Sequence, residues 1–386
     1  GRRYMKKVVI RGPVMTQSGY GVHARQFVKY AMKRTDWDVK FQVTPWGMTP
    51  WLVNTEDPVI DFIAKRSIPF ENPDLSIQIQ LPNEWDPTLA KKNVGVTAAV
   101  ETTNCNPQWI NAVNQMDAVI VPSKFTKKVL EDTGHISTNL VVVNEAYPEE
   151  FENCKTFLDL DLSTDFNMLV YGQITGINAE SDRKNFFYAL KWLCEVFKDD
   201  EEVGIVVKTN SGKNTKIDRE VTSNLIKKLL KAVRPGKFPK IHLVHGNLTN
   251  TEVAELYRNP KIKGLVTATR GEGYGLPILE AAASDLPVIA TNWSGHLDFM
   301  QYGKFVALDY DLVTIPGEMA DNQIFMQGSK WAQVSESDFK RKVKKFRSSS
   351  KVPKDWAISL GKIIREKFSQ EAVENNISTV LSEVSP

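Results

Sequence analysis

The sequence has little cysteine and no long apolar run. Its 386 residues include three cysteines, Cys105, Cys154 and Cys194, which are far apart. An odd count without metal-ligand spacing favours a reducing compartment over a disulfide framework. No apolar stretch reaches the ~20 residues of a membrane-spanning helix, and the basic start GRRYMKK leads into a short strand rather than a signal-peptide core. The sequence therefore predicts a soluble, cytoplasmic protein without a transmembrane segment.

Motifs for metal or ATP binding are absent or weak. The sequence has neither a His/Cys cluster of the zinc-binding kind nor the GxxxxGK[ST] pattern of a P-loop. Three Asp-x-Asp triplets, which can bind a metal ion, lie at Asp36/Asp38, Asp159/Asp161 and Asp309/Asp311. Such triplets are expected by chance in a chain with 46 acidic residues. We therefore expect no metal and no cofactor.

The charge balance and the length set broad limits. A net charge of +3 with 25% charged residues does not by itself require a polyanionic partner. A chain of this length with 42% hydrophobic residues can form two or three domains with sizeable cores.

One stretch, Gly264 to Asp298, has the order of a βαβ unit: an apolar run, a glycine-rich turn, an Ala/Leu helix and a second apolar run. Gly271, Gly273 and Gly275 alternate in the turn, so its backbone N–H groups can approach a ligand closely. Pro277 suits the first helical position. The free N–H groups and positive dipole end of this helix favour an anion such as a phosphate at the turn.

Two carboxylates flank this turn. Glu272 lies among the glycines, and Glu280 lies one turn into the helix, between Leu279 and Ala281. Because a carboxylate among apolar residues is costly to bury without a partner, Glu280 should be hydrogen-bonded by a ligand or by a neighbouring donor. If the two glutamates are considered alone, the alternative to a ligand-binding site is an ordinary βαβ crossover whose helix carries acidic residues by chance.

Apolar runs and helical patterns alternate in both halves of the chain. In the first half, strands are expected at Lys6–Arg11, Val39–Val43, Ser76–Gln80, Val94–Val100, Ala118–Val121 and Leu140–Val143. In the second half, strands are expected at Asn167–Tyr171, Val203–Lys208, Ile241–Val244, Gly264–Thr269, Pro287–Thr291 and Phe305–Leu308. The alternation predicts an α/β fold with two doubly wound parallel sheets, joined by the polar stretch Tyr147 to Ser163.

Two features of the first half could face a ligand. A glycine turn with Gly19 and Gly21 stands at the start of a helix, although a plain βα connection explains it equally well. Glu101 follows the Val94–Val100 run, and a residue at the carboxyl end of a parallel strand projects into the crevice where ligands bind. Glu101 is therefore a candidate acceptor-side base or a residue that positions the acceptor.

The EGYGLPILEA segment resembles the Glu-x7-Glu signature of retaining glycosyltransferases of the family 4 type, which have the GT-B architecture. The resemblance implies two Rossmann-like domains facing a cleft. The acceptor-side domain would span residues 1–155 and the nucleotide-sugar-binding domain residues 160–365. A C-terminal helix at about 366–386 would pack back on the first domain.

The same resemblance implies roles for individual residues. Glu272 would contact the donor sugar and Glu280 the ribose. The other donor-binding candidates lie in the two glycine turns and in the HGNL segment, where the backbone meets the base: Gly19, Gly21, Gly273, Tyr274, Gly275, Leu276, Asn247 and Leu248. The donor would be a UDP-hexose such as UDP-glucose.

Cations must stabilise the diphosphate that leaves, if no metal does so. The family has a Gly-Arg pair followed by a Lys, whereas this chain has Gly172 and Gln173 at the pair. Lys184 matches the Lys best, and either Arg183 or Lys208 would supply the missing positive charge.

A basic run, FKRKVKKFRSSSKVPK, begins at Phe339 and has eight basic residues and no acidic one. A solvated helix face is the ordinary interpretation, but basic clusters with interleaved Phe are also one footprint of nucleic-acid binding. The candidate contacts are Lys340, Arg341, Lys344 and Lys345. The overall pattern also resembles, more loosely, transferases of bacterial viruses that glycosylate hydroxymethylated bases.

The acceptor that this looser resemblance favours is 5-hydroxymethylcytosine in duplex DNA, with a glycan, a protein or a lipid as alternatives. A sugar phosphorylase of the same architecture is the enzymatic rival of a glycosyltransferase. A non-catalytic subunit that binds nucleotide-sugar is the non-enzymatic rival. Dependence on nucleotide-sugar rather than on free phosphate would separate the two enzymes.

Overall fold

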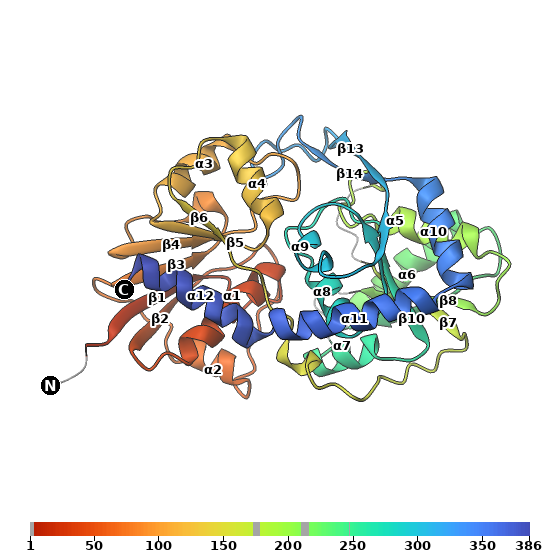
Figure 1. Cartoon of the computed structure of the whole chain (residues 1–386), viewed down its shortest axis with the longest axis horizontal. Coiled ribbons are helices and arrows are strands. Elements are labelled where there is room, and N and C mark those ends of the chain that lie inside the picture. Colours follow the sequence, from red (N-terminus) through yellow and green to blue (C-terminus); the bar gives the residue numbers. More distant parts are fainter. Residues whose placement is uncertain (1–3, 173–177, 210–215, 247) are drawn as a thin grey trace. The chain divides into compact units, whose positions relative to one another are not determined.

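The computed structural model describes residues 4–172, 178–209, 216–246 and 248–386, and the chain forms two compact units (Figure 1). Unit 1 comprises Gly1–Ala146, Asn322–Met326 and Gln370–Pro386, and unit 2 comprises Tyr147–Asp321 and Gln327–Ser369. The division falls at Ala146, before the polar stretch that the sequence suggested as a linker. This stretch belongs to unit 2 because its residues Tyr147 and Phe151 are buried in a core of that unit.

Unit 1 has a six-stranded parallel sheet in the order β2-β1-β3-β4-β5-β6. Its strands are β1 (Lys6–Gly12), β2 (Trp37–Val43), β3 (Leu75–Ile79), β4 (Lys92–Val96), β5 (Ala118–Val121) and β6 (Asn139–Val142). Its helices are α1 (Gly19–Met32), α2 (Pro58–Ala64), α3 (Pro107–Asn114), α4 (Lys124–Thr133) and α12 (Gln370–Val384), with a short 3-10 turn at Pro82–Glu84.

The core of unit 1 combines strands with helices from both ends of the chain. Val8 and Ile10 of β1 are fully buried, as parallel strands covered on both faces require. Ile377 of α12 lies in the same core cluster. The α12 helix lies beside α1 (Figure 1), where Gln370 Nε2 donates a hydrogen bond to the Gln26 carbonyl oxygen at 3.1 Å. A terminal helix thus completes the first unit.

Unit 2 has a second six-stranded parallel sheet, in the order β12-β11-β10-β7-β8-β9, and a two-stranded antiparallel sheet. The parallel strands are β7 (Phe166–Tyr171), β8 (Val203–Thr209), β9 (Lys240–His245), β10 (Ile262–Thr267), β11 (Val288–Thr291) and β12 (Val306–Leu308), and the hairpin is β13 (Tyr310–Thr314) with β14 (Lys330–Val334). The helices are α5 (Phe186–Val196), α6 (Lys216–Val233), α7 (Asn250–Tyr257), α8 (Leu276–Ala283), α9 (Leu297–Met300), α10 (Glu336–Ser348) and α11 (Lys351–Lys367), with a 3-10 turn at Glu149–Phe151.

The strand orders locate the ligand-binding edges. In unit 2 the order reverses between β7 and β10, the first and fourth strands of that sheet, and in unit 1 it reverses between β1 and β3. In open α/β sheets ligands bind at the carboxyl ends of the strands at such a reversal. The expected fold class, two doubly wound parallel sheets, is confirmed, and each sheet has one such edge.

Some boundaries differ from the expected ones. The Val94–Val100 run is a strand only as β4, which ends at Val96, so Glu101 lies five residues beyond the strand. The helix expected at about 366–386 begins at Gln370, and α11 ends separately at Lys367. None of the helices in the described part of the chain has the length and hydropathy needed to cross a membrane.

Candidate functional site

The turn between β10 and α8 lies at the reversal in the unit 2 sheet. Gly275 ends this turn with φ +98°, a left-handed conformation that favours glycine, and α8 begins at Leu276. Pro277 is the second residue of α8, inside the first turn, where its missing N–H is not needed. Gly295 packs so closely on the turn that a Cβ atom there would lie 2.2 Å from the Gly273 carbonyl oxygen. The backbone of this turn is therefore tightly fixed.

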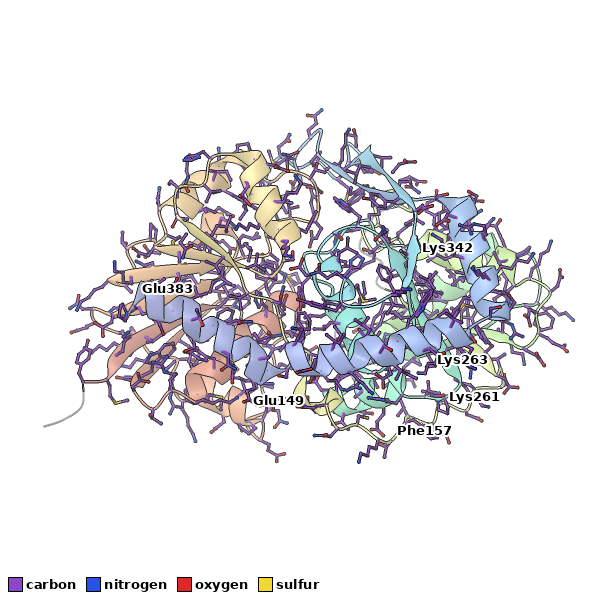
Figure 2. The ribbon with its side chains drawn as sticks, viewed as in Figure 1. Glu149, Phe157, Lys261, Lys263, Lys342 and Glu383 are labelled. Atoms are coloured by element: carbon purple, nitrogen blue, oxygen red, sulfur yellow. The ribbon has the colours of Figure 1, made fainter. Side chains whose placement is uncertain are left out.

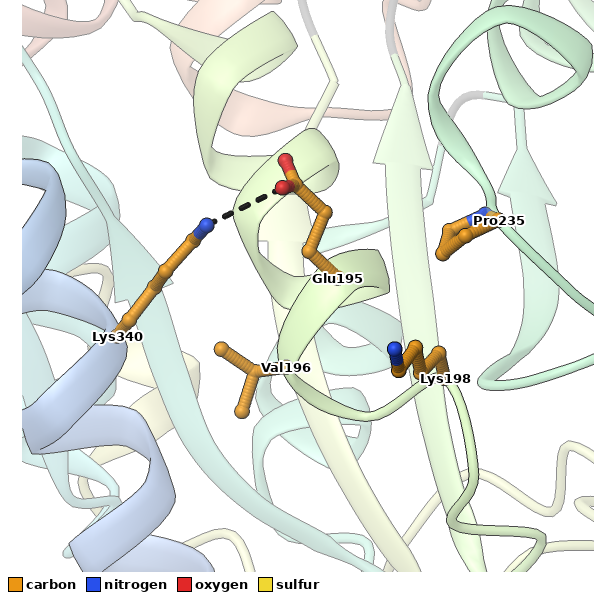
Figure 3. A pocket seen from close by; sticks show the side chains of 5 residues that line it. All are labelled: Glu195, Val196, Lys198, Pro235 and Lys340. Atoms are coloured by element: carbon orange, nitrogen blue, oxygen red, sulfur yellow. Dashed lines mark hydrogen bonds and ion pairs between the residues drawn. The ribbon is translucent and has the colours of Figure 1, made fainter.

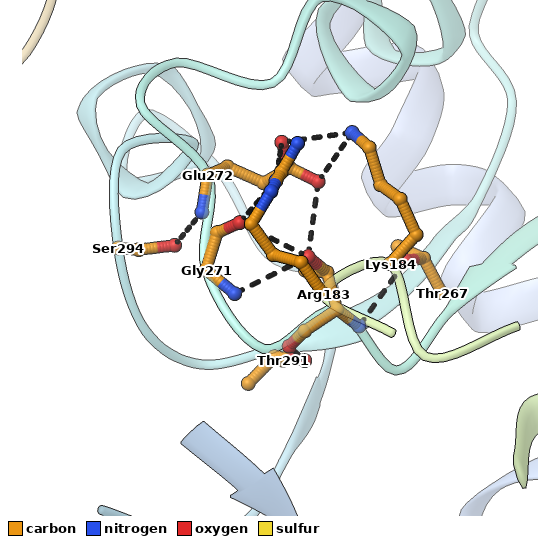
Figure 4. Close-up of polar contacts among 8 residues, drawn as sticks. Arg183, Lys184, Thr267, Gly271, Glu272, Thr291 and Ser294 are labelled. Carbon is orange, nitrogen blue, oxygen red and sulfur yellow. Dashed lines mark hydrogen bonds and ion pairs between the residues drawn. The ribbon is translucent and has the colours of Figure 1, made fainter. Parts of the chain in front are cut away.

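Glu272 is the centre of a buried ionic cluster (Figure 4). Lys184 Nζ lies 2.9 Å and 3.0 Å from the two carboxylate oxygens of Glu272. Arg183 Nη1 lies 3.3 Å from Glu272 Oε2 and donates to the Gly271 carbonyl oxygen at 2.6 Å. Thr269 Oγ1 donates to Glu272 Oε1 at 3.0 Å. The loop between β7 and α5 thus brings two cations to one carboxylate of the glycine turn.

The two cations keep Glu272 ionised. Only 6% of the residue is exposed, and burial by itself would raise the pKa of the carboxyl. The charges of Lys184 and Arg183 outweigh burial and lower the pKa of Glu272 to about 2. Lys184 and Arg183 thus bring two positive charges to a turn where an anionic ligand could bind.

The loop between β11 and α9 holds Glu272 in position. The Glu272 N–H donates to Ser294 Oγ at 2.9 Å, and the Gly295 N–H donates to the Glu272 carbonyl oxygen at 2.8 Å. His296 is completely buried, and its Nε2 lies 2.6 Å from the Thr291 carbonyl oxygen, to which it must donate. Its Nδ1 atom is buried with no hydrogen-bond partner among the described residues.

His296 was not among the residues chosen from the sequence. Burial lowers the pKa of its ring, against the opposing effect of the hydrogen bond to Thr291. The ring is therefore neutral next to the ionised Glu272. A lone histidine has no local pattern that marks it, so only the folded loop reveals its place.

Glu280 and Lys208 are two further ionisable groups at this edge, and the charge of each acts on the pKa of the other. Lys208, the last but one residue of β8, is 2% exposed and donates to the Gly246 carbonyl oxygen at 3.0 Å. Burial lowers the pKa of Lys208 to about 8 and raises the pKa of Glu280 to about 8, while the opposite charge of each partly offsets the effect on the other. The Glu280 carboxylate has no hydrogen-bond or ion-pair partner within the described ranges. The Glu280 carboxylate therefore fits the expectation that a ligand would supply its hydrogen-bond partner.

Two tyrosines support the start of α8. The hydroxyl groups of Tyr171 and Tyr257 are 2.5 Å apart, and Tyr257 donates to the Pro277 carbonyl oxygen at 3.0 Å. Burial is the main reason that the pKa of each phenol is raised, and the charge of Glu280 raises both further. Both phenols are therefore neutral hydrogen-bond donors.

Arg270, which was also not chosen from the sequence, connects the glycine turn with the loop between β7 and α5 that carries Lys184. It is 1% exposed; Nε donates to the Asp182 carbonyl oxygen at 3.0 Å, and Nη1 donates to Gln333 Oε1 at 2.5 Å. Its backbone N–H donates to the Arg183 carbonyl oxygen at 2.8 Å. Arg270 therefore positions the segment that carries both cations.

The other donor-side candidates have different surroundings. Tyr274 is 3% exposed and its ring packs on Phe299, so only its backbone can face a ligand. Leu248 packs against the same core. Asn247 lies outside the described residues.

The unit 1 candidates lie on a different sheet from Glu272. A Cβ atom at Gly21 would lie 2.2 Å from the Thr16 carbonyl oxygen, whereas a Cβ atom at Gly19 would meet nothing within 4 Å. Close packing therefore explains why position 21 is a glycine, whereas a Cβ atom at position 19 would lie in open space. Glu101 is partly buried in the bend that follows β4.

The basic run covers most of α10 and the start of α11, and its aromatic residues point inward. Phe339 and Phe346 are 0% and 1% exposed in the core of unit 2, so the idea of Phe residues interleaved with the cations on a binding surface is wrong. Lys340 pairs with Glu195 at 3.1 Å across a shallow hollow that Val196, Lys198 and Pro235 also line (Figure 3).

Other cations of α10 have acidic partners as well. Arg341 pairs with Asp338 at 2.7 Å, and Lys342 (labelled in Figure 2) pairs with Asp338 at 2.9 Å. Lys344 and Lys345 are exposed and have no ion pair to the described residues. Two of the four proposed DNA contacts are therefore already engaged within the protein.

The Asp-x-Asp triplets do not converge. Asp36 pairs with Arg34 at 2.7 Å, and Asp309 lies 3.7 Å from Lys342 Nζ. In the described ranges, His, Cys, Asp and Glu side chains form no group of three or more that could hold a metal ion.

Residues 226–308, which include the turn and both glutamates, match the family model of glycosyl transferases group 1. The segment around Glu272 is thus similar to glycosyl transferases group 1. A curated relative, a probable sucrose-phosphate synthase from Thermosipho melanesiensis, is 29% identical over 166 residues. That alignment covers 42% of this chain and 35% of the relative, so the chain matches about a third of the relative's length.

Solved structures share the fold over the whole chain. A sucrose-phosphate synthase from Thermosynechococcus elongatus has a TM-score of 0.58 at 14% identity and covers 98% of both chains. A structure described as trehalose-6-phosphate from E. coli bound with UDP-2-fluoro glucose has a TM-score of 0.65 at 8% identity and covers 99% of this chain and 100% of the other. The chain thus has the GT-B plan of two Rossmann-like domains.

Proposed function

We propose that the protein is a glycosyltransferase that moves a sugar from a nucleotide-diphosphate sugar, of the UDP-hexose class, to an acceptor hydroxyl. The observation that carries this proposal is the buried Glu272 cluster at the sheet reversal. Its carboxylate lies inside the segment that matches glycosyl transferases group 1. An ionised carboxylate can accept hydrogen bonds from the hydroxyl groups of a donor sugar. The neighbouring cations can meet the charge of its diphosphate.

The reaction that we propose is retaining and independent of metal. The family 4 resemblance suggests attack on the same face from which the nucleoside diphosphate leaves, with the leaving phosphate taking the acceptor proton. The new glycosidic bond forms as the bond to the phosphate oxygen breaks, and the electron pair of the broken bond goes to the phosphate. Lys184, Arg183 and the N–H groups at the start of α8 stabilise that charge.

One experiment tests this function. The purified protein is incubated with UDP-, GDP- and ADP-hexoses in the presence of EDTA, and NMR follows release of the nucleoside diphosphate and the anomeric configuration of the product. We expect release from a UDP-hexose with retained configuration. A requirement for free phosphate instead of a nucleotide-sugar would indicate a phosphorylase, and nucleotide binding without release would indicate a non-catalytic subunit.

Replacing Glu280 with Ala is expected to weaken binding of the donor more than it lowers turnover. A contact to the ribose would be present in both the ground state and the transition state, so its loss raises KM with little change in kcat. The change should be about 10- to 150-fold, the range of hydrogen bonds to a charged group. Glu336→Ala, an exposed residue of α10, is the matched control. An unchanged KM for the donor would remove Glu280 from the site.

For the acceptor, we propose 5-hydroxymethylcytosine in duplex DNA, and the exposed Lys344 and Lys345 of α10 are the observation that supports it. Binding to such a duplex should fall steeply with salt. Replacing both lysines with Ala should reduce the slope of log affinity against log salt by about 0.9 for each phosphate that the variant no longer neutralises. Lys340→Ala, in which an already paired cation is removed, is the control. A weak, salt-independent association would contradict a DNA acceptor.

A further inference from the structure

The loop that carries Arg183 and Lys184 begins with a turn closed by a side chain. Asn178 Oδ1 accepts the N–H groups of Glu180 and Ser181, at 3.0 Å each. An asparagine side chain that accepts from the backbone a few residues further on replaces a backbone turn and fixes the chain locally. Ser181, the last residue of this turn, is 1% exposed. The turn therefore sets the direction in which the chain continues towards the two cations.

Glu318 joins this turn from the segment between β13 and β14 of unit 2. Its Oε1 atom accepts hydrogen bonds from Ser181 Oγ at 2.5 Å and from Asn178 Nδ2 at 2.6 Å. These two hydrogen bonds lower the pKa of Glu318, so its carboxylate is ionised at neutral pH. Hydrogen bonds to an ionised acceptor are stronger than those between neutral groups. One carboxylate thus holds both the first and the last residue of the turn.

Two further groups hold the same loop. The Asp182 carboxylate accepts the Phe186 N–H at 2.9 Å, at the start of α5. Arg270 donates from Nη2 to the Ala179 carbonyl oxygen at 3.2 Å and from Nε to the Asp182 carbonyl oxygen at 3.0 Å. Removing Glu318 would therefore loosen the turn without detaching the loop or unfolding α5.

The two cations depend on this turn because they follow it directly. Arg183 lies two residues after Ser181, and Lys184 lies three residues after it. Both pair with Glu272, Lys184 at 2.9 Å and Arg183 at 3.3 Å, and each is 20% exposed. A donor that is already in place when negative charge develops needs no reorganisation during the reaction. A shift of the turn would move both positive charges away from their places.

We propose that Glu318 is a positioning residue for the cations that meet the diphosphate of the sugar donor. It acts through Asn178 and Ser181, by fixing the loop that carries Lys184 and Arg183. Because a carboxylate repels a diphosphate, Glu318 acts through this loop and not by binding the donor. This inference rests on the proposed function, in which the two cations stabilise the diphosphate as it leaves.

The test combines Glu318→Ala with Lys184→Ala in a double-mutant cycle. Calorimetry measures the affinity for UDP, and steady-state kinetics with a UDP-hexose measure kcat and KM. We expect Glu318→Ala to lower the affinity for UDP and kcat/KM by about 3- to 10-fold, the scale of one hydrogen bond. In the Lys184→Ala background the same substitution should have a smaller effect, because one of the two cations that it positions is already absent.

Conservative variants separate the hydrogen bonds from the charge. Glu318→Gln keeps an oxygen that can accept from Ser181 and Asn178, so it should restore most of the lost kcat/KM. Asp311→Ala, which removes an exposed carboxylate of β13, is the matched control and should leave both the UDP affinity and kcat/KM as in the wild type. Since Glu318 is exposed, its variants should fold, and their melting temperatures verify this.

Amide hydrogen exchange tests the loop without any ligand. In Glu318→Ala the N–H groups of Glu180 and Ser181 should exchange faster than in the wild type, because the side chain that accepts from them is no longer held. Equal exchange in the two proteins would overturn the assignment. An equal loss of kcat/KM in the wild-type and Lys184→Ala backgrounds would also overturn it, because Glu318 would then only anchor the segment between β13 and β14.

Absence of both UDP binding and UDP release in the wild-type protein would instead refute the proposed function. The exchange of the two amides needs neither a donor nor a reaction. It would still decide whether Glu318 holds the loop that carries the cations.

Discussion

Replacing Glu272 with Ala is expected to lower kcat by about 100- to 1000-fold with a much smaller change in the donor KM. The carboxylate is buried, ionised and held by Lys184 and Arg183. In the proposed reaction it contacts the sugar that undergoes substitution, so its removal acts on the transition state more than on the bound donor. Steady-state kinetics with a UDP-hexose measure both constants.

A control must separate chemistry from folding. Removing Glu272 leaves two cations without their counter-ion, which for a buried pair costs about 3–5 kcal/mol of stability. Glu272→Gln keeps the size of the side chain, and its melting temperature shows whether it folds. Glu195→Ala also breaks ion pairs, with Lys191 and Lys340, but lies away from the turn. A folded Glu272→Gln variant with wild-type kcat would remove Glu272 from the reaction.

The Glu272 cluster also has a signature in the pH dependence of stability. The folded-state pKa of Glu272 is about 2, below its ordinary value of 4.5. Because the pKa of Glu272 is lower in the folded state, its ionisation stabilises the fold at pH values above the unfolded-state pKa. This contribution, on the order of 3 kcal/mol, is lost as the pH falls from about 4.5 towards 2. Glu272→Gln should flatten the acid limb of the denaturation profile relative to Glu195→Ala.

Replacing Lys184 with Ala is expected to lower kcat/KM by about 100- to 1000-fold, equivalent to ~2.7–4 kcal/mol for one donor to a developing negative charge. Lys184 is the cation closest to Glu272 and is 20% exposed, so its ammonium is shielded from bulk water but open to a ligand. The missing charge would have met the diphosphate as it leaves. Kinetics with a UDP-hexose measure the effect.

The matched control is Lys191→Ala on α5, which removes a lysine of similar chain context that pairs with Glu195 at 2.7 Å. It should retain wild-type kinetics. If Lys184→Ala also retained them, the diphosphate charge would have to be met by other groups, such as Arg183 or Lys208. Arginine keeps the positive charge of Lys184 but changes the shape of the side chain. The pH profile of kcat/KM for Lys184→Arg would then distinguish loss of charge from loss of shape.

Local patterns were enough for the fold class and for the turn around Glu272. Parallel strands buried on both faces require continuous apolar runs, and these are visible in the sequence as β1 and β8. The turn needs glycine at Gly275 because of its positive φ, and a helix must follow for its N–H groups to face a ligand. Such requirements act within a few residues, so the sequence alone shows them.

The prediction from the sequence was wrong for the surface of α10, because the composition of a segment does not show in which direction its side chains point. A helical pattern with Phe339 and Phe346 among cations could place the rings outside, but packing in the unit 2 core places them inside. The acidic partners of its cations come partly from α5, as with Glu195. A charge run therefore does not predict a charged surface when its counter-ions come from another element.

The sequence by itself determined the two doubly wound sheets and the glycine turn, because each depends on local backbone and burial requirements. The family resemblance added Glu272 and Lys184 as candidate site residues. Only the tertiary structure decided that Arg270 and His296 support this turn and that Glu318 contacts the loop that carries Lys184. These contacts join residues from different loops at one sheet edge. Their energies depend on distance in space rather than on separation along the chain, so no local pattern records them.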